Sequence, residues 1–247
     1  MLHSAITQTY HIIYSQPVAG VDLWQIPLRQ PAPAQAQLAE ALTPDEQERA
    51  GRFRFDRDRN AFQVARGAMR LLLATYLNIA AAAVPLRYAP RGKPFLAEPY
   101  VPVKFNLSHA GDWALLAVSA GRELGVDIEQ IRPLSDLDSL ARRFFAPAEQ
   151  TELRALPPEQ RPRAFFTCWT RKEAFIKAMG EGLSQPLDQF EVTLRPGEPA
   201  RLRRVAGDAG AVERWSLHAL PVPSGYVAAL AAAQVAAQTA AAERPPD

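Results

Sequence analysis

A carboxylate and an ammonium group stand one helical turn apart in residues 168–178, which read Cys-Trp-Thr-Arg-Lys-Glu-Ala-Phe-Ile-Lys-Ala. No Gly or Pro interrupts 163–179 and Gly180 supplies a stop signal, so this segment is predicted to be a helix. At 100° per residue, Glu173 lies within a largely apolar stripe of that helix. A lone buried charge is costly and needs a partner. Either Lys177, as an i,i+4 pair, or a metal ion can neutralise it.

Two further carboxylates lie on a predicted strand, Gly125-Val126-Asp127-Ile128-Glu129. Because side chains alternate along a strand, Asp127 and Glu129 share one face while Val126 and Ile128 share the other. The two carboxylates repel each other unless a cation lies between them or the face is open to solvent. An Asp-x-Glu pair of this kind is typical of a hard cation with oxygen ligands.

Two other segments offer groups that suit phosphate. Arg91-Gly92-Lys93-Pro94 presents a cation on a tight bend, and such bends can hold an anion. Asn106-Leu107-Ser108-His109 places small polar groups and an imidazole at a strand end, where Asp112 can favour the protonated imidazole. Taken alone, each segment is equally compatible with an ordinary polar turn.

Composition limits the classes of protein that fit. The chain has 247 residues, 48% of them hydrophobic, which is enough for one large or two small domains. The net charge is +2 without a long basic run, so a nucleic-acid partner is not expected. No apolar run is long enough to span a membrane. The single cysteine, Cys168, excludes an internal disulfide framework and favours a reducing, cytoplasmic setting.

The periodicity predicts a mixture of helices and strands. Thr43-Pro44-Asp45-Glu46 has the form of a helix start, and Pro147 opens another helix with Glu149 in its first turn, where a carboxylate complements the helix dipole. Residues 31–37 are expected to form a connector. Further helices are predicted at 57–79, 136–144 and 163–179, and strands at 11–14, 21–28, 103–110, 113–119, 124–131, 190–194, 200–205, 215–220 and 225–230.

Acidic groups next to phosphate-type cations are what Mg²⁺-dependent chemistry on a pyrophosphate requires. Magnesium takes a few carboxylates and leaves its other positions to phosphate oxygens and water. Basic side chains then neutralise charge on the leaving group. The candidate ligands are Asp127, Glu129 and Glu173, and the candidate cations are Lys93, His109, Lys172 and Lys177.

The sequence resembles a known family, the 4′-phosphopantetheinyl transferases. The resemblance is to the larger, pseudo-dimeric group, typified by the enzyme that activates surfactin synthetase. The resemblance covers about 91–192 and rests on Gly125-Val126-Asp127-Ile128-Glu129 with Trp169-Thr170-Arg171-Lys172-Glu173-Ala174-Phe175-Ile176-Lys177. It continues over Arg91-Gly92-Lys93-Pro94, Phe105-Asn106-Leu107-Ser108-His109, Arg143-Phe144-Phe145, Gly180-Glu181-Gly182-Leu183-Ser184 and Pro186-Leu187-Asp188-Gln189-Phe190. Upstream, Thr43 to Phe53 also fits, except that Glu46 stands where some members carry a basic coenzyme-binding residue.

The resemblance implies an α+β fold of two similar α/β subdomains related by a pseudo-twofold, with coenzyme A in the cleft between them. The subdomains would be 1–120 and 121–232, and 233–247 would form a disordered tail. Asp127, Glu129 and Glu173 match the family's Mg²⁺ ligands. The groups that match or accompany the coenzyme's phosphate contacts are Arg49, Lys93, Ser108, His109, Lys172 and Lys177.

The resemblance also implies the reaction. A serine of an apo acyl or peptidyl carrier protein attacks the β-phosphate of coenzyme A, and adenosine 3′,5′-bisphosphate leaves. Glu149 or Glu173 would accept the serine proton, and Lys177 would stabilise the leaving group. The carrier, an acidic helical bundle, would dock near Arg142-Arg143-Phe144-Phe145, and the enzyme is expected to act as a monomer.

Two other functions remain open from the sequence. A Mg²⁺-dependent nuclease also uses Asp, Glu and Lys at a phosphodiester, but its Glu-x-Lys on one strand is missing because Gln130 and Ile131 follow Glu129. A non-catalytic module that binds a carrier protein or coenzyme A is the second alternative. The complete set of carboxylates and the lysine disfavours a decayed site of that kind.

Overall fold

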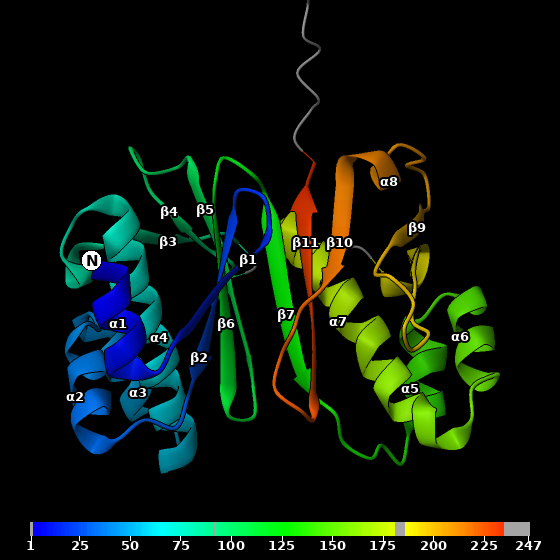
Figure 1. Ribbon diagram of the computed structural model, residues 1–247, viewed down its shortest axis with the longest axis horizontal. Coiled ribbons are helices and arrows are strands. Elements are labelled where there is room, and N and C mark those ends of the chain that lie inside the picture. Colours follow the sequence, from blue (N-terminus) through cyan, green and yellow to red (C-terminus); the bar gives the residue numbers. More distant parts are fainter. Residues whose placement is uncertain (1, 91, 181–185, 235–247) are drawn as a thin grey trace, which may run out of the picture.

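The computed structural model describes residues 2–90, 92–180 and 186–234, and two antiparallel sheets stand at its centre (Figure 1). The first sheet has the order β1-β2-β6-β5, formed by Ile13–Val18, Val21–Pro27, Trp113–Ala120 and Val103–Ala110. The second has the order β10-β11-β7, formed by Trp215–Ala219, Tyr226–Ala233 and Leu124–Gln130. The chain therefore leaves the first sheet at Ala120 and enters the second at Leu124, and we propose 1–120 and 121–232 as the two subdomains on this basis.

Helices and one small hairpin accompany each sheet. The first half of the chain carries α1 (Leu2–Tyr10), α2 (Ala32–Glu40), α3 (Pro44–Gly51), α4 (Asp56–Leu77) and the hairpin β3 (Leu86–Tyr88) with β4 (Pro94–Leu96). The second half carries α5 (Leu137–Phe144), α6 (Pro147–Arg154), α7 (Arg161–Met179), the hairpin β8 (Phe190–Val192) with β9 (Leu202–Val205), and α8 (Ala211–Arg214). None of the helices described is long and apolar enough to cross a membrane.

The two halves repeat one arrangement. Each runs from a strand through two short helices, one long helix and a small hairpin to two final strands. In sheet order, β2, β6 and β5 of the first half correspond to β7, β11 and β10 of the second. The fold is therefore α+β with two similar subdomains, as the sequence predicts.

The repeat extends to a buried glutamate at the start of one short helix in each half. Glu46 of α3 accepts a hydrogen bond from the Thr43 backbone N–H at 3.0 Å, and Glu149 of α6 accepts one from the Ala146 N–H at 2.8 Å. Both carboxylates are buried and also paired with cations on the long helix of their own half. The acidic residue at position 46 thus has a structural role in the first subdomain.

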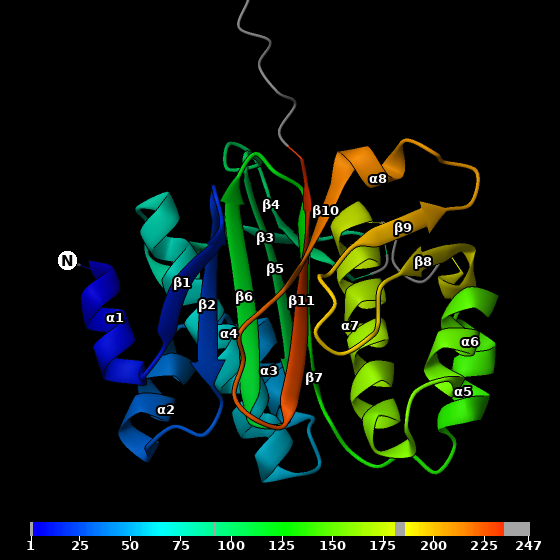
Figure 2. The same cartoon turned by 45° about the vertical axis from the view of Figure 1, so that its right-hand side comes forward.

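The structure has four layers with apolar cores between them, visible from left to right in Figure 1, and Figure 2 shows the same elements turned by 45°. One core lies between α4 and the first sheet, another between α7 and the second sheet. A third core joins the two sheets face to face, with Leu23 and Leu115 from the first and Val126, Ile128 and Leu230 from the second. The sheets are consequently held together by buried apolar surface.

Two predictions about the N-terminal and C-terminal parts need correction. Residues 31–37 were expected to be a connector but form most of α2, because both prolines lie at its start, where proline is tolerated, and Ala and Gln fill the rest. The expected tail begins too early, since Ala233 belongs to β11. Residues 235–247 lie outside the part of the chain that the structure describes.

Candidate active site

Three of the predicted site residues, Ser108, Asp127 and Lys177, meet where the edge strand β5 of the first sheet packs beside the edge strand β7 of the second. Asp127 of β7 accepts a 2.8 Å hydrogen bond from the Ser108 hydroxyl of β5 through its Oδ1 atom. The Lys177 ammonium of α7 lies 2.6 Å from the same oxygen and donates to the Ser108 Oγ at 3.2 Å. Residues from three separate segments of the sequence therefore form one hydrogen-bonded group.

Close packing of α7 against β7 brings these side chains together. Alternation along β7 directs Val126 and Ile128 into the core between the sheets and Asp127 toward α7. Gly125 permits the approach, because a Cβ atom there would lie 2.2 Å from the Ala174 carbonyl oxygen. Glycine at this position is required by the contact between strand and helix.

Burial raises the pKa of the Asp127 carboxyl, although the Lys177 ammonium and the Ser108 hydroxyl oppose that effect. One oxygen of this carboxylate, Oδ2, is buried without a hydrogen-bond partner among the described residues. Buried polar atoms normally have partners, and exceptions are frequent at functional sites. Asp127 thus has one oxygen available for a further ligand.

Glu129 and Glu173 add negative charge to the same region. Burial raises the pKa of each carboxyl, and the Asp127 charge raises both further. Glu129 also lies 3.5 Å from the Arg132 guanidinium, a partner that the sequence analysis did not identify. The carboxylates therefore repel one another, as expected for a group that takes a cation.

The donor set fits Mg²⁺, which prefers carboxylate oxygens. The unpartnered Asp127 Oδ2 atom supports this assignment. Across 2–90, 92–180 and 186–234, however, no three His, Cys, Asp or Glu side chains are close enough together to hold a metal as they stand. Binding of Mg²⁺ by Asp127, Glu129 and Glu173 would thus require side-chain rotation.

Lys93 reaches this region from the first subdomain. Its ammonium donates to the Lys177 backbone carbonyl, in the last turn of α7, and to the Leu124 carbonyl at 3.4 Å. Burial lowers the pKa of the ammonium. A cation at the C-terminal end of a helix interacts favourably with the helix dipole, so Lys93 stabilises the junction whether or not it also holds a phosphate.

His109 points to the opposite face of β5 from Ser108. Successive residues of β5 point to opposite faces, and His109 lies on the exposed part of the face that carries Phe105. Burial and the Lys177 charge lower the pKa of the imidazole, while Asp127 raises it. Asp112 was expected to favour the protonated form of His109 by its negative charge, but it forms ion pairs with Arg29 and Arg57.

Glu149 and Lys172 form a buried ion pair away from this group, with Lys172 Nζ 2.7 Å from Glu149 Oε2 and neither residue exposed. Lys172 also donates to the carbonyls of Leu187 and Phe190 at 2.7 and 2.5 Å. In this position Glu149 cannot act as a general base and Lys172 cannot contact a phosphate. Both expectations are corrected: the pair belongs to the core of the second subdomain.

One arginine, Arg49, completes the predicted set. Arg49 is exposed on α3, and its guanidinium lies 5.3 Å from the centroid of the Phe62 ring on α4. Its role at a phosphate stays a prediction. Arg91 lies outside the residues that the structure describes.

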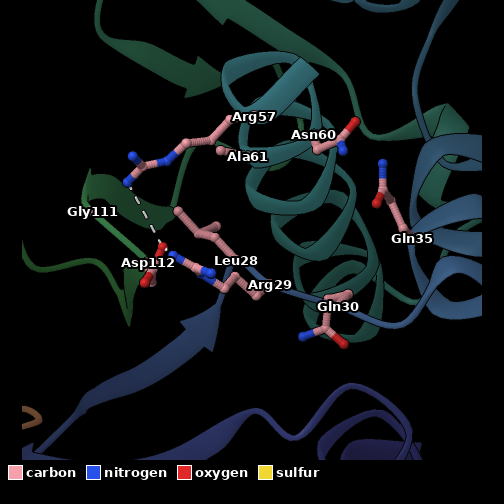
Figure 3. Close-up of a pocket in the computed structure, with 9 residues that line it drawn as sticks. All are labelled: Leu28, Arg29, Gln30, Gln35, Arg57, Asn60, Ala61, Gly111 and Asp112. Carbon is pink, nitrogen blue, oxygen red and sulfur yellow. Dashed lines mark ion pairs between the residues drawn. The ribbon is translucent and has the colours of Figure 1, made fainter. Parts of the chain in front are cut away.

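Cavities are found beside the group as well as away from it. One of about 280 Å³ is lined by Lys93, Phe95, Lys104 and Met179, next to the site. A second, of about 400 Å³, lies between the start of α4 and the β5–β6 turn, where Asp112 meets Arg29 and Arg57 (Figure 3). The Tyr226 hydroxyl of the second subdomain accepts a 3.1 Å hydrogen bond from the Asp112 N–H, so that turn also joins the subdomains.

Comparisons with known proteins agree with this architecture. A family model described as the 4′-phosphopantetheinyl transferase superfamily matches residues 123–231, and one described as 4′-phosphopantetheinyl transferase, N-terminal, matches 29–121. The 4′-phosphopantetheinyl transferase HetI of Nostoc sp. is 43% identical over 215 residues, covering 86% of this chain and 87% of HetI. The 4′-phosphopantetheinyl transferase of Bacillus subtilis is 35% identical over 156 residues, covering 63% and 67% of the two chains.

Solved structures give a partial match. The holo-[acyl-carrier-protein] synthase of Thermotoga maritima aligns with a TM-score of 0.36 and 19% identity, covering 45% of this chain and 62% of that one. An ACPS–coenzyme A complex from Chronobacterium ammoniagenes aligns with a TM-score of 0.34 and 20% identity, covering 46% and 98%. On the sequence matches over both subdomains, the chain is an enzyme of the 4′-phosphopantetheinyl transferase family.

Proposed function

We propose that the protein transfers 4′-phosphopantetheine from coenzyme A to a serine of an apo acyl or peptidyl carrier protein, in the presence of Mg²⁺, and releases adenosine 3′,5′-bisphosphate. The observation that carries the proposal is the hydrogen-bonded group of Ser108, Asp127 and Lys177 at the junction of the subdomains. Carboxylates and an ammonium in one place suit a pyrophosphate substrate.

In the proposed reaction the serine oxygen bonds to the β-phosphorus of coenzyme A. The bond from that phosphorus to the bridging oxygen breaks, and the oxygen leaves with the electron pair as part of adenosine 3′,5′-bisphosphate. Lys177, oriented by Asp127 and Ser108, is positioned to neutralise the charge that develops on the leaving group. The chemistry that Mg²⁺ bound by Asp127, Glu129 and Glu173 supplies is charge neutralisation on the pyrophosphate.

Glu173 is the better candidate for the proton acceptor. It is partly exposed, whereas Glu149 is fully buried against Lys172. The serine proton is therefore assigned to Glu173, directly or through water.

The proposed surface for the carrier lies on α5. Arg142 and Arg143 are exposed at the end of this helix, and Phe144 packs edge-on against Trp169 with ring centroids 5.4 Å apart. Exposed arginines next to a partly buried aromatic pair suit an acidic helical partner. Phe145, also expected there, is fully buried and cannot take part.

Intact-mass spectrometry of apo fatty-acid, polyketide and peptide carriers, incubated with the protein, coenzyme A and Mg²⁺, tests the proposal. The expected result is a gain of one phosphopantetheine on at least one carrier, with adenosine 3′,5′-bisphosphate as co-product. Coenzyme A binding without any mass gain would support the non-catalytic module, and cleavage of a nucleic acid would support the nuclease. A monomeric enzyme in the cytoplasm remains part of this proposal.

A further inference from the structure

The edges of β5 and β7 meet without a shared strand ladder, since the two strands belong to different sheets. Side chains of the first subdomain provide the polar contacts to β7 instead. Lys93 donates to the Leu124 carbonyl at 3.4 Å, Asn106 Oδ1 accepts from the Val126 N–H at 2.8 Å, and Ser108 donates to Asp127 Oδ1 at 2.8 Å. These three contacts follow one another along β7.

Asn106 makes the middle contact and is only 4% exposed. It lies two residues before Ser108, on the same side of β5, and its partner Val126 directly precedes Asp127. A buried N–H that lacks an acceptor is unfavourable, so the Asn106 carbonyl oxygen favours this one register of β7. The ladder with β11, from Tyr226↔Gln130 to Ala232↔Leu124, fixes β7 within its own sheet, so the Asn106 contact fixes where β7 lies along β5.

We propose that Asn106 is a positioning residue: by accepting the Val126 N–H it holds β7 in the register that places Asp127 beside Ser108 and Lys177. Only the kinetic effects expected of the Asn106 variants rest on the proposed function, and the structural role of Asn106 does not. Asn106 itself touches no reacting atom. Its effect passes through the carboxylate that Ser108 and Lys177 share.

The chain offers a matched control in Gln25. Its side-chain amide is also buried, at 6% exposed, and also joins the subdomains, by donating to the Pro221 carbonyl at 2.9 Å. Gln25→Leu and Asn106→Leu therefore each remove one buried amide contact between the same two bodies. Asn106→Asp keeps an acceptor oxygen at the position and serves as the conservative rescue.

Two measurements on the full-length variants decide the inference. The first is residue-resolved amide exchange at Val126, which is expected to accelerate in Asn106→Leu and to stay slow in Gln25→Leu and Asn106→Asp. The second is steady-state transfer, in which Asn106→Leu should raise the KM for coenzyme A and the Mg²⁺ concentration for half-maximal rate by about tenfold, the scale of lost ligand support. Gln25→Leu should change neither.

The inference is overturned if Asn106→Leu leaves Val126 exchange unchanged, or if its kinetic constants match those of Gln25→Leu at equal stability. If the unmodified protein transfers nothing to any carrier, the proposed function fails. Amide exchange at Val126, with calorimetric binding of coenzyme A to the same variants, still decides whether Asn106 positions the group.

Discussion

Burial and pairing decide what each charged side chain can do. Lys172 and Glu149 lie 2.7 Å apart with no exposed surface, so removing one partner leaves the other charge buried and unpaired. We predict that Lys172→Met lowers the free energy of unfolding by about 3–5 kcal/mol. The double variant Lys172→Met, Glu149→Gln should recover part of that loss, because no unpaired charge remains.

Denaturant unfolding and transfer assays on folded protein test the structural role of this pair. The double variant is expected to keep kcat near that of the unmodified enzyme. A double variant that folds stably but transfers nothing would show that Glu149 or Lys172 takes part in catalysis.

Glu173 is expected to lower the stability of the protein while supporting its activity. Burial raises the pKa of its carboxyl in the folded protein. The Asp127 and Glu129 charges raise this pKa further, and the Lys177 charge lowers it. Its ionisation therefore costs stability as pH rises through that pKa. We predict that Glu173→Gln raises the melting temperature in chelator at pH 7 and lowers transfer on the order of a hundredfold or more.

The pH dependence of the Glu173→Gln effect provides the check. Below the ordinary pKa of a glutamic acid both side chains are neutral, so the gain in melting temperature should disappear when pH is lowered through that range. A gain that persists at low pH would mean that packing, and not charge, limits stability at this position.

The family resemblance placed Asp127, Ser108 and Lys177 at one site, and their side chains are hydrogen-bonded to one another. Residue patterns alone grouped Asp127, Glu129 and Glu173 around a cation. They could not separate Glu173 from Glu149, since both are glutamates on helices. The two glutamates differ in burial, because the core covers a different face of each helix. Which face is covered depends on strands that are distant in the sequence. The Pro-x-Glu at the start of both α3 and α6 was the available signal for a structural role.

At the scale of elements, the contact between β7 and α7 positions the carboxylates. A Cβ atom on Gly125 would lie 2.2 Å from the Ala174 carbonyl oxygen and 2.3 Å from the Ala178 nitrogen, so strand and helix would have to separate. We predict that Gly125→Ala lowers stability by about 1–3 kcal/mol, as overpacking does, and lowers transfer with it. Gly51→Ala, which meets no atom within 4 Å, is the control and should change neither.

Element types were largely predictable because strand alternation and helical spacing are strong over β5 to β7 and over α4 and α7. The elements α1, β3, β4 and α8 were not predicted, and α2 shows the limit of the method. Pro31 and Pro33 make the segment rich in proline and so suggest a loop. Both lie at the start of α2, where proline is compatible with a helix. The meeting of the edges of β5 and β7 was not predictable, because these strands share no ladder and touch through side chains such as Asn106 and Ser108.

For the whole molecule, the core between the sheets ties the two subdomains into one folding unit. Leu115 is fully buried in it, against the second sheet. We predict that Leu115→Ala costs about 2–5 kcal/mol and that probes in both subdomains unfold in one transition. Separate transitions, followed by tryptophan fluorescence at Trp24 and Trp169, would show that the halves are stable independently.

The charge on α5 concerns the whole molecule, because it determines how a second protein approaches the site. Arg142 and Arg143 are exposed, and a carrier with an acidic surface would be attracted to them over several ångströms. We predict that Arg142→Glu with Arg143→Glu raises the KM for the carrier about tenfold or more at low salt and leaves the KM for coenzyme A unchanged, since peripheral charges act mainly on association. Added salt should narrow the difference from the unmodified enzyme.

For the control, the α5 variant is Arg142→Glu alone, and Arg201→Glu makes the same change of net charge. Arg201 is also an exposed arginine of the second subdomain but lies next to β9. Steady-state kinetics with one carrier at several ionic strengths compares the variants. If Arg201→Glu weakens the carrier's KM as much as the α5 variant does, net charge alone governs association. A selective effect of the α5 variant that is lost at high salt would place the approaching carrier beside Phe144 of α5 and Trp169 of α7. The helix α7 also carries Glu173 and Lys177.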